Sequence, residues 1–155
     1  MRTIRTLLSW LLALALIAAF VQSNIFPLGS PADAAGQIKL WDKPGENIVF
    51  QTLADRSGYA LFEPAGRFVT SIVELLAAFL LLLPWTRRLG AIIAGVVMGA
   101  ATALHMSDWL GREIPLSLDA PAPTDNGVLF MLAIAMLVAS FLLVIIHPGR
   151  EKHGY

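Results

Sequence analysis

The chain of 155 residues contains no cysteine and few charged side chains. The absence of cysteine excludes disulfides, thiol redox chemistry, cysteine-ligated zinc or iron–sulfur sites and covalently attached haem. Charged residues make up only 14% of the chain, whereas soluble proteins average about 25%. So little charge would not cover the surface of a soluble protein of this size. The formal net charge of zero also argues against a nucleic-acid partner.

In place of charge, the sequence has four long apolar stretches. Each approaches the ~20 residues with which an α-helix crosses the hydrocarbon core of a bilayer. We therefore expect an all-α membrane protein, in which the whole chain (1–155) forms one four-helix bundle. The expected spans are about 6–22, 67–85, 89–106 and 127–147. They leave a long extracytoplasmic loop at 23–66, a second at 107–126, and a cytoplasmic tail at 148–155.

The basic residues predict which side of the membrane each segment faces. Six of them share a side with the amino terminus: Arg2, Arg5, Arg87, Arg88, Arg150 and Lys152. The longer loops on the other side hold nine acids and five basic residues. By the positive-inside rule, both termini face the cytoplasm of a bacterial inner membrane. A rival interpretation makes the first stretch a cleaved signal peptide, but residues 20–23 form a poor cleavage site.

The first outer loop has the pattern of a short helix at 46–55. Ile48, Val49 and Leu53 fall on one side of it. Two interpretations stay open: a helix lying on the outer membrane surface, or one packed on top of the bundle.

Glu74 is the only acid within the apolar stretches. It shares a helix face with Arg67, Thr70 and Ser71, and this face should point into the bundle because an acid facing lipid costs several kcal/mol. The carboxyl group either hydrogen-bonds a neighbouring helix for assembly, or exchanges protons and binds the headgroup of a quinone or lipid.

His105 ends the third expected span, with Thr102 and Asp108 one turn to either side. Antiparallel packing of the second and third spans would bring these residues near Arg67 and Glu74. The candidate outer pocket therefore consists of six polar residues: Arg67, Thr70, Glu74, Thr102, His105 and Asp108. A histidine beside carboxylates suits metals, but a lone interfacial histidine is more often simply a hydrogen-bonded polar group. We predict no metal site.

Small residues recur every four positions along the third span, at Ala91, Gly95, Gly99 and Ala103. Such a stripe allows close helix packing in lipid. We expect it to pack within this bundle, with a dimer or a partner subunit as the alternative.

Several segments together resemble the DoxX-like family of small four-helix membrane proteins. They are residues 37–40, 49–53, 63–67, 73–84, 89–91, 99–105 and 126–130. The resemblance implies a four-helix bundle with cytoplasmic termini, and it singles out Arg67, Glu74 and His105. It also implies a link to sulfur or redox metabolism, since some relatives are the membrane subunit of a thiosulfate:quinone oxidoreductase.

Two functions remain in view. The first is a non-catalytic accessory or anchoring subunit of a larger membrane assembly, an electron-transfer complex in particular. Such a subunit would contact lipid and another membrane protein or a second copy of itself. The alternative is a component of a quinone-linked oxidoreductase. We expect no intrinsic cofactor in either case, and at most a bound quinone or lipid.

Overall fold

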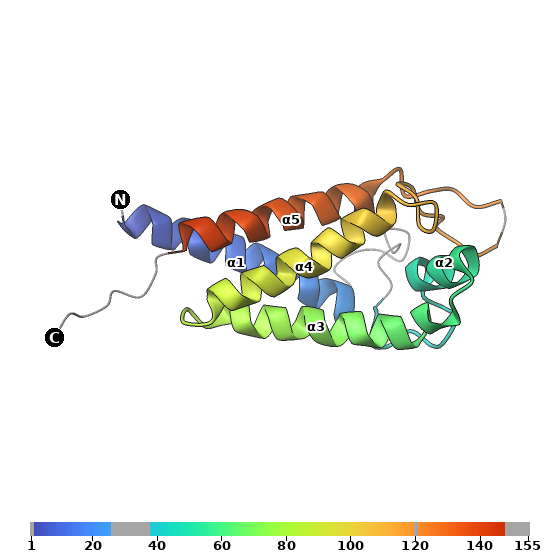
Figure 1. Cartoon of the computed structure of the whole chain (residues 1–155), viewed down its shortest axis with the longest axis horizontal. Helices are drawn as coiled ribbons and strands as arrows, with labels where there is room; N and C mark the ends of the chain where they lie inside the picture. The colour runs from blue at the N-terminus through green and yellow to red at the C-terminus, as the bar shows by residue number, and fades with distance from the viewer. Residues whose placement is uncertain (1, 26–37, 120, 148–155) are drawn as a thin grey trace.

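The described part of the chain contains four long α-helices and one shorter α-helix (Figure 1). The structure, a computed structural model, describes residues 2–25, 38–119 and 121–147. The helices are α1 (Arg2–Asn24), α2 (Ile48–Ser57), α3 (Ala65–Leu82), α4 (Arg87–His105) and α5 (Val128–Ile146). A 3-10 turn, η2 (Ala60–Phe62), joins α2 to α3. In these ranges β pairing is limited to one isolated bridge, Pro115 to Thr124, so the all-α prediction is confirmed.

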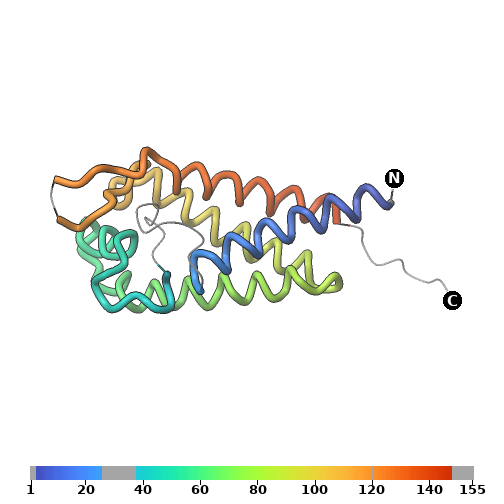
Figure 2. The backbone as a smooth tube through the Cα atoms, turned by 180° about the vertical axis from the view of Figure 1, so that it is seen from behind, coloured from blue at the N-terminus to red at the C-terminus, as the bar shows by residue number. Residues whose placement is uncertain are grey.

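The long helices pack as a ring in the order α1, α3, α4, α5. In this ring α1 contacts α3 and α5, and α4 contacts the same two helices. Figures 1 and 2 show the amino-terminal end of α1, the α3–α4 turn and the carboxyl-terminal end of α5 at one end of the bundle. We call this the turn end. The opposite end carries α2 and the loop between α4 and α5, and we call it the α2 end.

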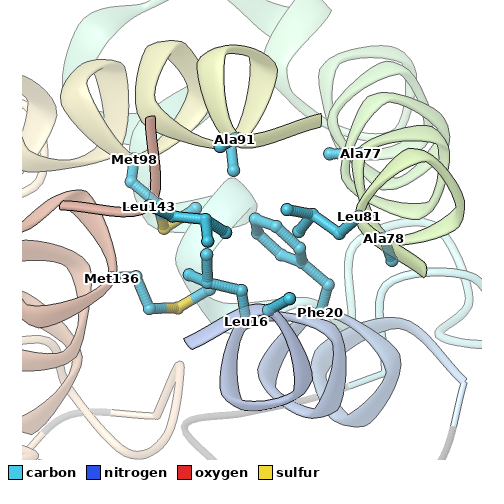
Figure 3. Close-up of a cluster of buried hydrophobic side chains, with 11 residues drawn as sticks. Leu16, Phe20, Ala77, Ala78, Leu81, Ala91, Met98, Met136 and Leu143 are labelled. Atoms are coloured by element: carbon cyan, nitrogen blue, oxygen red, sulfur yellow. The ribbon is translucent and has the colours of Figure 1, made fainter. Parts of the chain in front are cut away.

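The core is apolar and is built from all four long helices. Figure 3 shows Leu16 and Phe20 of α1 pointing toward Leu81 of α3 and Leu143 of α5. The outside is apolar too, because large side chains such as Phe79 and Phe141 are mostly exposed. A surface of this kind suits lipid, and each of the four long helices is long and apolar enough to cross a membrane.

The expected helix bounds are close to those observed, but α1 begins at Arg2, four residues before its expected start, and α3 ends three residues early. The second expected span ran to residue 85, but α3 ends at Leu82 and Leu83 is extended. Pro84 explains this, because a proline disfavours the α conformation of the residue before it. Trp85 therefore lies in the turn, where its side chain is exposed.

The short helix expected in the first loop is present as α2. Asn47 is the N-cap residue of α2, and its side-chain Oδ1 accepts a hydrogen bond from the backbone N–H of Phe50. Leu53 packs against Leu110 and Ile114 of the loop between α4 and α5. The helix therefore sits on other parts of the protein, as in the second of the two interpretations. Residues 26–37 of the predicted loop lie outside the described residues.

The helices α3 and α4 touch most closely at the turn end. A Cβ atom added at Gly90 would lie 2.7 Å from the backbone nitrogen of Leu81. Further along α4, Gly95 and Gly99 face Ser140 and Leu137 of α5. The predicted stripe of small residues is thus used inside the bundle at these positions, while Ala103 is exposed. From the Gly90 contact, α3 and α4 diverge toward the α2 end (Figure 1).

Candidate functional site

The divergence of α3 and α4 leaves a cavity of about 460 Å³ in the half of the bundle nearest α2. All four long helices and α2 contribute to its walls. Most of the lining is apolar, and Phe20, Phe50, Leu53, Val97 and Leu132 are typical members. This volume lies within the roughly 300–1,000 Å³ of ordinary ligand pockets.

The cavity opens sideways, between α3 and α4. Val69 of α3 and Val96 of α4 both line it, yet they are 61% and 68% exposed. Because the exposed surface of these helices suits lipid, this side of the cavity is suited to a ligand that enters from a bilayer.

Glu74 forms the most polar part of the cavity wall. It is only 2% exposed, and Lys39 Nζ lies 2.6 Å from its Oε2. Asn24 Nδ2 donates to the same oxygen at 2.7 Å and Ser23 Oγ at 3.5 Å. All three bonds end on Oε2, so Oε1 accepts no hydrogen bond from the described residues. The carboxylate is thus paired with the Lys39 ammonium, and within the described part of the chain its second oxygen has no donor.

His105 supplies a second open acceptor. Its Nδ1 lies 2.8 Å from the backbone oxygen of Gly111. A carbonyl oxygen only accepts, so Nδ1 carries the proton, and in the neutral ring Nε2 is then an acceptor. No hydrogen bond within the described residues uses Nε2, although the ring packs against Phe130 at 5.6 Å between centroids. His105 and Glu74 line the same cavity.

Arg67 does not line the cavity, but it contacts the backbone of Lys39, which does. Its guanidinium is completely buried and pairs with Glu63, with Nε 2.9 Å from Oε2 and 3.0 Å from Oε1. Its Nη1 donates to the backbone oxygen of Lys39. Arg67 thereby fixes the backbone that presents the Lys39 ammonium to Glu74.

Glu63 and Asp42 extend this support toward α2. Glu63 Oε1 accepts the backbone N–H of Gly45 at 3.2 Å, and Asp42 Oδ2 accepts from Asn47 Nδ2 at 2.7 Å. Burial raises the pKa of the Asp42 carboxyl group, against the opposing effects of the Asn47 hydrogen bond and the Arg67 charge. Side chains therefore hold the segment between Lys39 and α2 at its start, through Arg67, and further along, through Glu63 and Asn47.

The six predicted site residues divide into three groups. Thr70, Glu74 and His105 line the cavity together, and Arg67 acts through Lys39. Thr102 instead donates to the backbone oxygen of Met98 at 2.7 Å. Asp108 is exposed, and neither it nor Thr102 is among the lining residues.

Lys39 is the functional residue that sequence reasoning missed. Lys39 is not among the six residues predicted for the pocket, yet its ammonium lies 2.6 Å from Glu74 Oε2. A usable signal was present, because Lys39 stands between the apolar residues Ile38 and Leu40. A lysine in that setting is suited to the boundary between lipid and water.

A second buried polar cluster lies at the turn end. Arg87 is 1% exposed; its Nε donates to the Leu81 backbone oxygen at 2.9 Å and its Nη1 to Ser9 Oγ at 3.3 Å. His147 Nε2 lies 2.9 Å from the Pro84 oxygen, so Nε2 carries the proton. Nδ1 then accepts from Ser9 Oγ at 2.7 Å. Burial lowers the pKa of His147, which is consistent with a neutral ring.

Comparison with protein-family models finds no matching family, and comparisons with curated proteins and with solved structures find no match either.

Proposed function

We propose that this protein binds a neutral, lipid-soluble molecule with a hydroxyl-bearing head, and that a quinol is the physiological member of this class. One observation carries the proposal: Glu74 and His105 line one otherwise apolar cavity, and neither Glu74 Oε1 nor His105 Nε2 accepts a hydrogen bond from the described residues. Open acceptors in an apolar setting favour a ligand that donates, because an unpaired buried polar group costs free energy. A hydroxyl group donates; a quinone oxygen or an ether does not.

The charge balance of the cavity favours a neutral head. The Lys39 ammonium and the Glu74 carboxylate form a pair at 2.6 Å, so this part of the wall has no net charge. An anionic head, such as that of a fatty acid, would add an uncompensated charge beside Glu74 in an apolar site. The sideways opening suits a molecule whose apolar tail stays between α3 and α4 or in the lipid.

We further propose that the ligand-binding protein is a subunit of an electron-transfer assembly in the bacterial inner membrane. The charge distribution supports an orientation with the turn end in the cytoplasm and the cavity near the outer surface. The resemblance to the DoxX-like family, some of whose members act with quinones, agrees with this proposal. The electron carrier would then belong to a partner subunit.

The second candidate is the accessory subunit without a ligand. It is favoured by exposed aromatic side chains at the α2 end, where Tyr59 and Trp109 stack edge to face at 5.7 Å beside the exposed Leu61. Aromatic residues are enriched in protein interfaces, so this surface suits a partner that projects beyond the membrane.

Binding of a short-chain quinol and of its dimethyl ether to the purified protein tests the first proposal. The ether keeps the ring and the tail but has no hydroxyl proton to donate. We expect the quinol to bind at least tenfold more tightly than the ether, equivalent to about 1.4 kcal/mol. His105→Phe should remove most of this difference while leaving assembly intact. Equal binding of the two compounds, or no binding of either, would contradict the proposal and favour the accessory subunit.

A further inference from the structure

The turn end has a surplus of positive charge, and we propose that it holds the phosphate group of an anionic phospholipid between Arg5 and Arg88. This site lies at the opposite end of the bundle from the cavity and does not depend on the function proposed above. The inference begins with how the two arginines are positioned.

Arg5 and Arg88 meet at the carboxyl-terminal end of α5. Arg5 Nε donates to the backbone oxygen of Ile146 at 3.1 Å, and Arg88 Nη2 donates to that of His147 at 2.9 Å. These oxygens belong to consecutive residues, and the last carbonyl groups of a helix have no partner within it. The bonds therefore hold two guanidinium groups, one from α1 and one from α4, at the same end of α5.

Both guanidinium groups keep donors for a ligand. Arg5 and Arg88 are exposed, and no hydrogen bond within the described residues uses Nη1 of Arg5 or Nε and Nη1 of Arg88. Arginine pairs with phosphate through parallel N–H bonds in a fixed geometry. Because each side chain is already anchored to a carbonyl oxygen, a phosphate would find two preoriented cations.

The surrounding charges strengthen the attraction for an anion. Arg87 lies buried nearby, and Trp10 covers its guanidinium at 3.7 Å from the ring centroid. Within residues 2–25, 38–119 and 121–147, every acid belongs to α3 or to the segments of the α2 end. The helix ends of α3 and α5 contribute only about half a negative charge each. The described residues of the turn end therefore carry a net positive charge.

The site lies at the end of an apolar helix and continues into an apolar surface. Ile146 is the last residue of α5, which is long and apolar enough to cross a membrane, so in a bilayer the two arginines would lie near the lipid phosphates. One turn deeper than the two arginines lie Leu8 of α1 and Ile92 of α4, whose side chains are 45% and 51% exposed. A phosphate between the arginines thus has room for its acyl chains on the same surface. This favours a phospholipid over free phosphate.

The test is lipid binding by the full-length protein in a neutral detergent. Native mass spectrometry would count retained lipids during titration with phosphatidylglycerol and with phosphatidylcholine of the same acyl chains. We expect phosphatidylglycerol to be retained preferentially, and the double variant Arg5→Gln/Arg88→Gln to bind it about 30-fold more weakly. That estimate takes a contribution of about 1 kcal/mol per arginine near a membrane surface.

Arg112→Gln is the matched control for the single variants Arg5→Gln and Arg88→Gln, since Arg112 is an exposed arginine at the α2 end and each of these substitutions removes one positive charge. This variant should bind phosphatidylglycerol like the wild type. Equal retention of the two lipids, or equal weakening by Arg112→Gln, would overturn the proposal.

Thermal unfolding provides a second measurement. Phosphatidylglycerol should raise the unfolding temperature, and inorganic phosphate should not reproduce this stabilisation. Equal stabilisation by the two would overturn the choice of a lipid. If the double variant does not fold, these two wild-type comparisons and the single variants decide the question.

Discussion

Each end of the bundle contains a buried arginine, and the groups that contact its guanidinium differ between the two ends. At the α2 end, Arg67 pairs with the Glu63 carboxylate at 2.9 Å. At the turn end, Arg87 is held by the Leu81 carbonyl oxygen, the Ser9 hydroxyl group and the face of Trp10, without a carboxylate among the described residues.

This difference accounts for the ligand chemistry proposed at each end. Paired charges at the α2 end leave a cavity wall of no net charge, which suits a neutral head. At the turn end, no carboxylate of the described residues pairs with an arginine, and the resulting positive surface suits an anion. Backbone carbonyl groups and an aromatic face are enough to bury a guanidinium, but they do not neutralise it.

Breaking the Arg67 pair should have the largest effect on stability. Glu63→Leu leaves the Arg67 charge buried without its carboxylate, and we expect a loss of about 3–5 kcal/mol in the free energy of unfolding. Thermal or denaturant unfolding in detergent measures the loss. The double variant Glu63→Leu/Arg67→Met should recover most of it. No recovery would mean that the charge is not the cause.

Changing the close contact between α3 and α4 should have the next largest effect. In Gly90→Ala the new Cβ would lie 2.7 Å from a backbone nitrogen of α3, so the helices must move apart, at a cost of about 1–3 kcal/mol. Gly95→Ala is the matched control, because its Cβ would meet Ser140 Cβ at an ordinary 3.6 Å. Comparable unfolding temperatures for the two variants would show that α3 and α4 have room for a Cβ atom at Gly90.

Removing the negative charge of Glu74 should make the α2 end resemble the turn end. In Glu74→Gln the Lys39 ammonium loses its carboxylate, so the cavity becomes positive and a fatty acid should bind about tenfold more tightly than to the wild type, a gain of about 1.4 kcal/mol. Titration with a spin-labelled fatty acid measures this. Unchanged fatty-acid binding would contradict the proposed role of charge balance in the cavity.

The smallest expected effect is a pH dependence of stability at the turn end. Burial lowers the pKa of His147 in the folded protein, the Pro84 hydrogen bond opposes this, and the charges of Arg87 and Arg88 lower it further. The unfolded chain therefore takes up a proton first as the pH falls below about 6.5, so stability decreases there and is constant above that value.

Unfolding temperatures between pH 5 and 8 measure this dependence, and His147→Gln should reduce its slope below pH 6.5. The same slope in the variant would assign the pH dependence to another group.

Much of the fold was predictable from the sequence, because apolar runs of this length have few alternatives to spanning helices. The position of Glu74 inside the bundle followed from the cost of placing an acid in lipid. Its partner Lys39 did not, because that contact depends on how Arg67 holds a loop far away in the sequence. Similarly, the sequence predicts the stripe of small residues. It does not predict that Gly90, next to this stripe in the sequence, makes the closest contact between α3 and α4.

The most direct test of the proposed site is the state of the His105 ring. In ¹⁵N-histidine-labelled protein, NMR reports which ring nitrogen carries the proton, and comparison with His105→Phe assigns the signals. We predict that Nδ1 carries a proton, and that the Nε2 signal shifts when the quinol is added but not when its dimethyl ether is added. A proton on Nε2, or a signal that the quinol leaves unchanged, would contradict the account.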